Sequence, residues 1–167
     1  MATINFQGKA IHTNSELPPV GSQAPNFTLV NGQLKEVTLA SYAGQKKVLN
    51  IIPSLDTPVC AASTRKFNEK ISNSDKAIVL VISQDLPFAQ GRFCESEGLK
   101  HVIPLSTFRS SFPEDYGVKL TDSILAGLTA RAVIVLDEHD VIIHSELVQE
   151  ITDEPDYEAA LAVVHRH

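Results

Sequence analysis

The pattern of hydrophobic and polar positions divides the chain into short apolar runs, which predict strands, and longer mixed stretches, which predict helices. The run Ala77–Ile82 is continuously apolar and largely β-branched, as expected of a central strand that is covered on both faces. Further strands are predicted at residues 47–52, 102–105, 132–136 and 141–147. Helices are predicted at residues 57–71 and 85–97, the second ending before Gly98, and a last helix starts at Pro155.

Two predicted hairpins precede these elements. Residues 3–13 form two short runs around a turn at Gln7 and Gly8, and the pair Asn31-Gly32 separates the runs 27–30 and 37–39. The order is therefore hairpins, then β-α-β-α-β with parallel crossovers, then an antiparallel hairpin and a C-terminal helix. We expect an α/β protein with a thioredoxin-like fold: a mixed central β-sheet of about five core strands flanked by helices on both faces, with an N-terminal β-hairpin. The spacing alone also allows other small α/β folds.

Length and composition limit the functions that need to be considered. The 167 residues favour a single domain over 1–167, with residues 1–16 as a hairpin extension. The net charge of −6, without a basic run, argues against nucleic-acid binding. No apolar run approaches the about 18 residues of a membrane span, and the start of the chain lacks the features of a signal peptide, so we expect a cytoplasmic protein without membrane contact. In a reducing compartment, a pair of cysteines is more often catalytic than structural.

Cys60 is the most informative position for chemistry. It follows a predicted strand and lies in the first turn of a predicted helix, where Thr57 suits the N-cap and Pro58 the first helical position. Free backbone N–H groups and the helix dipole favour an anion there, and the thiolate is the reactive form of cysteine. The alternative is a small buried hydrophobe on the inner face of the helix, in line with Phe67 and Ile71.

The segment from Pro53 to Cys60 resembles the active-site motif of the peroxiredoxins, in which a Pro, three residues, a Thr and two residues precede the reactive Cys. The wider sequence resembles the thiol peroxidase branch of that superfamily, of the atypical two-cysteine type. The stretches that carry this likeness span nearly the whole chain: residues 48–51, 60–63, 86–94, 105–109, 130–133 and 154–160. The resemblance implies a thioredoxin fold, a homodimer, and reduction of hydrogen peroxide and organic hydroperoxides with thioredoxin as the reductant.

The resemblance also assigns roles to five residues. Cys60 is the peroxidatic cysteine, whose thiolate attacks the peroxide and becomes a sulfenic acid. Cys94 is the resolving cysteine, which attacks that sulfenic acid to form an intramolecular Cys60–Cys94 disulfide for thioredoxin to reduce. Thr57 orients the peroxide, Arg131 brings a positive charge beside the thiolate, and Pro53 screens the thiolate from water.

The residues by themselves also allow plainer roles. Pro53 is equally well explained as a strand terminator, and Thr57 as a helix cap. Without the resemblance, Arg131 is a surface residue, and Cys94 is a packed helix residue or one half of a static disulfide. A disulfide needs Cα atoms within about 7 Å, so we expect the regions around both cysteines to unwind locally during turnover.

We therefore expect a peroxide-reducing enzyme that uses cysteine chemistry alone, with no cofactor and no metal, since the six His residues are dispersed. The alternative is a monothiol thiol-disulfide oxidoreductase of thioredoxin-like fold, because Ser63 occupies the second position of a Cys-x-x-Cys motif. A non-catalytic thioredoxin-like binding domain is a third class, which would need neither Thr57 nor Arg131. A Cys-His hydrolase dyad stays open as well, although no His is singled out.

Overall fold

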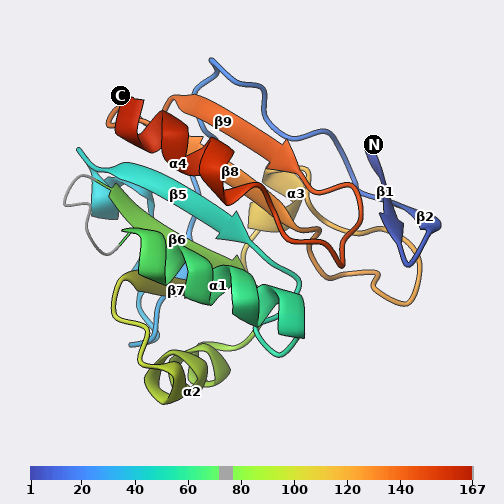
Figure 1. The fold of residues 1–167 in the computed structure, drawn as a ribbon, viewed down its shortest axis with the longest axis horizontal. Coiled ribbons are helices and arrows are strands. Elements are labelled where there is room, and N and C mark those ends of the chain that lie inside the picture. Colours follow the sequence, from blue (N-terminus) through green and yellow to red (C-terminus); the bar gives the residue numbers. More distant parts are fainter. Residues whose placement is uncertain (72–76, 167) are drawn as a thin grey trace.

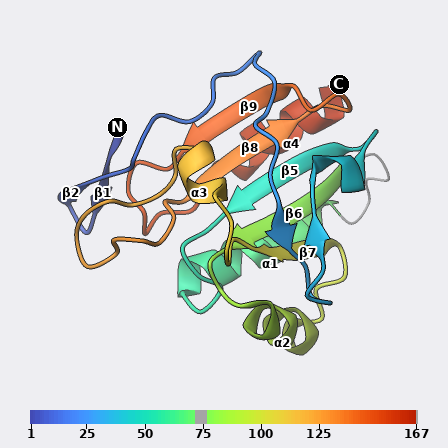
Figure 2. The same ribbon diagram turned by 180° about the vertical axis from the view of Figure 1, so that it is seen from behind.

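The computed structural model describes residues 1–71 and 77–166. Within these residues a mixed sheet of seven strands forms the centre of the molecule, in the order β4-β3-β7-β6-β5-β8-β9 (Figure 1). A separate hairpin, β1-β2, lies to one side of the sheet in both views (Figures 1 and 2). In chain order the elements are β1 (Thr3–Phe6), β2 (Lys9–His12), β3 (Leu29–Val30), β4 (Glu36–Val37), the 3-10 helix η1 (Leu39–Tyr42), β5 (Lys46–Ile51), α1 (Pro58–Ile71), β6 (Ala77–Ser83), α2 (Pro87–Glu97), β7 (Val102–Ser106), α3 (Phe112–Asp115), β8 (Ala132–Leu136), β9 (Ile142–Leu147) and α4 (Tyr157–Arg166).

The pairing of the strands confirms the predicted thioredoxin-like layout. β5 and β6 are parallel, as are β6 and β7, and α1 and α2 lie in the crossovers between them. β8 pairs antiparallel with β5, and β9 pairs antiparallel with β8 at the edge of the sheet. The expectation of about five core strands is too low, because the hairpin β3-β4 joins the same sheet by pairing Val30 with Ser106 of β7.

The two faces of the sheet are covered by different layers. α1 and α4 lie on one face, in front in Figure 1, where Val48 and Val133 of the sheet belong to the same buried cluster as Phe67 of α1 and Val164 of α4. The opposite face, seen in Figure 2, is covered by the short helix α3 and by the segments before β3 and after β4, which contribute Ala24, Phe27 and Leu39 to the buried cluster. Helices on both faces were predicted, and this is confirmed, although the second face carries only short ones.

Several predicted boundaries lie one or two residues from the observed ones, among them those of β5, α2 and α4. α2 starts at Pro87 instead of Asp85, because the Asp85 carboxylate accepts hydrogen bonds from the loop before α1. The last helix starts at Tyr157, two residues after Pro155. The turn between β3 and β4 is longer than two residues, since the Asn31 side chain accepts hydrogen bonds from the N–H groups of residues 33 and 35. α2 does end at Gly98, whose φ of 66° is the left-handed conformation that favours glycine.

The N-terminal hairpin packs against the segments on either side of the strand pair β8-β9. Ile4 and Ile11 are buried in one cluster with Leu120 and Ile151. The backbone carbonyl of Asn5 accepts a hydrogen bond of 2.9 Å from the N–H of Ile151. The end of β1 therefore lies beside the segment that follows β9.

Two lysines at the start of β5 are buried, on opposite faces of the sheet. The Lys46 ammonium donates a hydrogen bond of 2.9 Å to the carbonyl of Val164 in α4. The Lys47 ammonium forms an ion pair of 2.6 Å with Asp140 in the turn between β8 and β9. A buried cation needs such partners, so these contacts join β5 to α4 and to the turn between β8 and β9.

Candidate active site

The first turn of α1 carries Cys60 at the end of the loop that leaves β5. Pro58 is the first helical residue, as predicted, and the first helical hydrogen bond runs from the N–H of Ala61 to the carbonyl of Thr57 at 3.0 Å. The N–H groups of Val59 and Cys60 belong to the turn whose amides lack partners within the helix. These N–H groups and the positive end of the helix dipole favour negative charge at this position.

Cys60 is fully buried, and its backbone carbonyl accepts hydrogen bonds from two side chains of α1. The hydroxyls of Ser63 and Thr64 both donate to the Cys60 carbonyl oxygen, at 3.0 and 2.9 Å. The amide of Asn50 in β5 lies 3.4 Å from the Ser63 hydroxyl and can donate to it. The sheet and two side chains of α1 therefore brace the turn that presents the thiol.

Thr57 immediately precedes the helix, at the predicted N-cap position. Its hydroxyl donates a hydrogen bond of 3.0 Å to the carbonyl of Ser54. With the hydroxyl proton engaged in this way, the oxygen of Thr57 offers lone pairs as a hydrogen-bond acceptor. A hydroperoxide carries an O–H group that such an acceptor can orient.

A cavity of about 230 Å³ lies beside the first turn of α1 and brings together three predicted site residues, Pro53, Thr57 and Arg131. The rest of its wall is mostly apolar and comes from segments far apart in the sequence: Phe6, Ser54, Pro58, Val59, Leu125, Leu128, Ile151 and Thr152. Cys60 is not part of this wall, but it directly follows Val59, which is. A peroxide bound in the cavity is therefore close to the turn that holds the thiol.

Arg131 is 2% exposed, so the alternative of a surface residue is wrong. It directly precedes β8, and the antiparallel register that pairs Ile51 with Ala132 puts Arg131 where β5 ends and the loop to Cys60 begins. Its Nε donates to the carbonyl of Ile151 at 2.8 Å. Its Nη1 is buried and has no hydrogen-bond partner among the described residues. An unpartnered donor of a buried cation suits an anion or a polar oxygen.

Cys94 lies in α2 and is half-buried, next to the hydrophobic cluster that contains Cys60. Both cysteines are free thiols, so the static disulfide of the sequence-based alternatives is not present. Burial raises the pKa of the Cys94 thiol above its usual range, because the charged form loses solvation. Burial in α2 therefore favours the neutral form of the Cys94 thiol.

Two residues that the sequence does not single out, Phe6 and Asp85, also contribute to this region. Phe6 of the hairpin lines the cavity, and no local pattern connects it with Cys60. The Asp85 carboxylate accepts hydrogen bonds from the Ser54 hydroxyl and the Leu55 N–H, both at 2.7 Å. The available signal for Asp85 is an acidic residue shortly after a buried strand, and the same signal also predicts a helix start.

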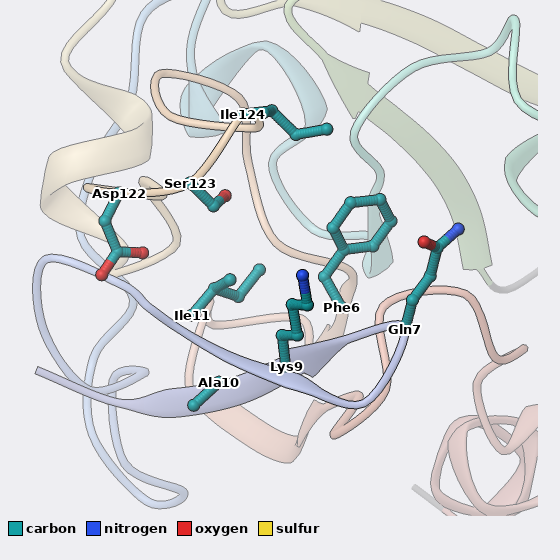
Figure 3. A pocket seen from close by; sticks show the side chains of 8 residues that line it. All are labelled: Phe6, Gln7, Lys9, Ala10, Ile11, Asp122, Ser123 and Ile124. Atoms are coloured by element: carbon teal, nitrogen blue, oxygen red, sulfur yellow. The ribbon is translucent and has the colours of Figure 1, made fainter.

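A larger cavity of about 500 Å³ lies along the N-terminal hairpin (Figure 3). Its wall consists of Phe6, Gln7, Lys9, Ala10, Ile11, Asp122, Ser123 and Ile124. Phe6 also lines the smaller cavity, but none of the predicted site residues and no thiol lies in this larger wall. The smaller cavity is therefore the candidate active site.

Over residues 1–71 and 77–166, no group of three or more His, Cys, Asp or Glu side chains is arranged to hold a metal ion. None of the helices in this described part of the chain has both the length and the apolar character needed to cross a membrane.

Comparison with known proteins first gives the class. Residues 19–161 match the model of the Redoxin family. A peroxiredoxin-like protein from Aquifex aeolicus has a crystal structure that matches this one with a TM-score of 0.94 and 37% sequence identity, covering 99% of this chain and 97% of that one. A thiol peroxidase from Chromobacterium violaceum, with a TM-score of 0.92 and 24% identity, shows the same fold over 99% of this chain and 97% of its own.

Relatives with higher sequence identity to this chain specify the family further. The thiol peroxidase of Corynebacterium glutamicum is 52% identical over 99% of this chain and 100% of its own length. That of Mycobacterium tuberculosis is also 52% identical, over 98% of this chain and 99% of its own length. The chain therefore belongs to the thiol peroxidases of the Redoxin family. It is an enzyme, a thiol-dependent peroxidase, and this family implies peroxide substrates and a thioredoxin-type reductant. The fold class, the family and the activity predicted from the sequence are confirmed.

The raised pKa of Cys94 predicts how its reactivity depends on pH. In a Cys60→Ser protein, alkylation of Cys94 by iodoacetamide should have its midpoint at higher pH in the folded protein than in urea, where the pKa is near the ordinary value of about 8.5. Between the two pKa values the unfolded chain binds fewer protons, so stability should fall as pH rises through that window. The midpoint of the rate profile, measured by mass spectrometry, is independent of access to the thiol. A folded-state midpoint at or below the one in urea would contradict the structure.

Proposed function

We propose that this thiol peroxidase uses Cys60 as its peroxidatic cysteine and Cys94 as its resolving cysteine. The observation that supports this most directly is the cavity beside the start of α1, where Pro53, Thr57 and Arg131 meet next to the buried Cys60. The alternative, a monothiol thiol-disulfide oxidoreductase, has no need for a peroxide-sized cavity with these donors around the thiol.

In the first step, the Cys60 thiolate attacks one oxygen of the peroxide. An S–O bond forms and the O–O bond breaks, so that the sulfur is oxidised to a sulfenic acid and the second oxygen leaves as hydroxide or alkoxide, which takes up a proton. Negative charge moves from sulfur to the leaving oxygen, and donors aimed at both stabilise the transition state. The free Nη1 of Arg131 and the N–H groups at the start of α1 supply such donors. The Thr57 oxygen accepts the peroxide O–H, and Pro53 keeps water from the thiolate.

The apolar wall of the cavity supports organic hydroperoxides as substrates beside hydrogen peroxide. Phe6, Leu125, Leu128 and Ile151 contribute apolar side chains to this wall. An alkyl group gains hydrophobic contact there, about 25 cal/mol for each Å² removed from water, and hydrogen peroxide has no such group.

In the second step, the Cys94 thiol attacks the sulfenic sulfur of Cys60. An S–S bond forms and water leaves, and the dithiol of a thioredoxin then reduces the intramolecular disulfide by exchange. Cys60 is fully buried and Cys94 is a neutral thiol in a separate helix, so this step needs a rearrangement. We propose that the first turn of α1 and the end of α2 unwind, which exposes both thiols to each other.

We also propose a homodimer, formed through an exposed apolar patch at the start of α2 and the loop after β7. Leu86, Phe88 and Phe108 are exposed by 49%, 71% and 44%. The two segments adjoin, because the Ser106 hydroxyl donates to the carbonyl of Asp85, the residue before Leu86. Exposed apolar groups in one patch are typical of protein–protein contacts.

The remaining expectations complete the proposal. Residues 1–167 act as one domain, in which the extension 1–16 contributes Phe6 to the cavity. The protein works in the cytoplasm, where thioredoxin and glutathione keep thiols reduced, as its two free cysteines require.

Replacing each cysteine in turn should have a different effect on peroxide reduction. Cys60→Ser should abolish peroxide reduction, because no nucleophile remains in the site. Cys94→Ser should consume one equivalent of peroxide per chain, stall with thioredoxin, and gain about 32 Da with excess peroxide as Cys60 becomes a sulfinic acid. The unchanged protein should lose about 2 Da within one chain under mild oxidation. Full thioredoxin-linked turnover of Cys94→Ser would instead show a one-cysteine enzyme resolved by an external thiol.

Thr57 and Arg131 should act on the rate of Cys60 oxidation and not on folding. We expect Thr57→Val and Arg131→Ala to slow this step by about 10²–10³-fold each, the usual loss for one transition-state donor or acceptor. Rapid-quench trapping of the sulfenic acid measures the rate, after circular dichroism has established that each variant is folded. Unchanged rates in both variants would reduce the two residues to a helix cap and a buried structural cation.

The dimer should appear in sedimentation at micromolar concentration as a species of about twice the 18.2 kDa of one chain. Phe88→Asp should shift it to the single-chain mass without loss of secondary structure, because a charge in an apolar contact costs solvation. A single-chain mass for the unchanged protein would disprove the dimer.

A further inference from the structure

Asp85 connects the end of β6 with the loop that precedes Cys60. Its Oδ1 accepts a hydrogen bond from the Ser54 hydroxyl, and its Oδ2 accepts one from the Leu55 N–H, both at 2.7 Å. The side chain is half-buried. Hydrogen bonds to a carboxylate are short and about twice as strong as those between neutral groups. The carboxylate therefore fixes two successive residues of the loop.

Ser54 passes this constraint on to Thr57. The Ser54 carbonyl accepts hydrogen bonds from both the N–H of Thr57, at 3.3 Å, and its hydroxyl, at 3.0 Å. Ser54 and Thr57 both line the candidate active site. The position of Ser54 thus determines where the Thr57 oxygen points.

Asp85 itself is held by the rigid part of the fold. Its Oδ2 also accepts a hydrogen bond of 2.8 Å from the hydroxyl of Ser83, the last residue of β6. The carbonyl of Asp85 accepts a bond of 2.7 Å from the Ser106 hydroxyl of β7. Gln90 of α2 donates to the Ser83 hydroxyl at 3.0 Å. Through Asp85, hydrogen bonds therefore connect the loop before α1 to the strands β6 and β7 and to the helix α2.

We propose that Asp85 is a positioning residue of the peroxide reaction, which keeps the Thr57 oxygen aligned by holding Ser54 and Leu55. This inference rests on the proposed role of Thr57 in orienting the peroxide. Asp85 does not itself line the cavity. A displacement of a reacting group by about 1 Å costs up to about 10²-fold in rate, so loss of the carboxylate should slow Cys60 oxidation by about 10- to 100-fold.

The test measures Cys60 oxidation in a Cys94→Ser background, by rapid quench with dimedone and mass spectrometry. Asp85→Asn and Ser54→Ala should both be slower, and Ser54→Ala keeps the charge of Asp85 in place. Asp56→Asn is the matched control, because it removes the same charge from an exposed side chain of the same loop and should react at the unchanged rate. Ser54→Thr retains the hydroxyl and should restore most of the rate lost in Ser54→Ala.

A double-mutant cycle with Thr57→Val separates positioning from a general structural effect. If Asp85 acts through Thr57, adding Asp85→Asn to Thr57→Val should cause little further loss of rate. Losses that multiply would overturn the proposal, as would a loss in Asp56→Asn equal to that in Asp85→Asn. If Asp85→Asn fails to fold, the comparison of Ser54→Ala with Ser54→Thr tests the proposal instead: a loss of rate in Ser54→Ala that Ser54→Thr restores supports it, and an unchanged rate in Ser54→Ala overturns it.

The same data distinguish this proposal from the proposed function. A slow Thr57→Val with unchanged rates in Asp85→Asn and Ser54→Ala would overturn only the role of Asp85. A Thr57→Val variant as fast as the starting protein, or peroxide consumption that survives Cys60→Ser, would overturn the catalytic assignment and with it the role of Asp85.

Discussion

The backbone N–H groups at the start of α1 are the interaction on which the rest of the site depends. They lack partners within the helix, and the turn that carries them also carries the fully buried Cys60. The position of this turn is fixed by the buried strand β5 and by the loop that joins β5 to α1. The carbonyl of Cys60, held by the hydroxyls of Ser63 and Thr64, keeps the turn from fraying. The other groups of the site are placed around this turn.

The register between β5 and β8 supplies the second condition, a buried cation at the right place. Arg131 directly precedes β8, and the antiparallel pairing sets it opposite the end of β5. Its Nε donates to the Ile151 carbonyl, while Nη1 has no hydrogen-bond partner among the described residues. A buried guanidinium with one unused donor is costly for stability unless an anion or a polar oxygen completes it. The arrangement is therefore better suited to binding a substrate than to holding the fold.

The two cysteines meet opposite physical demands. Cys60 lies where the helix start favours negative charge, whereas burial favours the neutral form of Cys94. In the proposed mechanism, a neutral Cys94 thiol does not compete with Cys60 for peroxide, because the thiolate is the nucleophile. The proposed disulfide step then requires α1 and α2 to rearrange before the two sulfurs meet. In this proposal, the hydrogen bonds that the Asp85 carboxylate accepts and the one that the Ser63 hydroxyl donates belong to the state that reacts with peroxide.

The sequence by itself determined the features that depend on neighbours in the chain. The apolar run of β6, the glycine stop of α2 and the Thr57-Pro58 start of α1 follow from local periodicity and backbone preference, and they located the thiol correctly. Only the tertiary structure decided the burial of Arg131, the contribution of Phe6 to the cavity and the hydrogen bonds of Asp85. These depend on strand register and on contacts between segments far apart in the chain, which no local pattern encodes. Local sequence predicts a helix start at Asp85 for that reason: its signal is the same whether its carboxylate caps its own helix or accepts hydrogen bonds from the loop before α1.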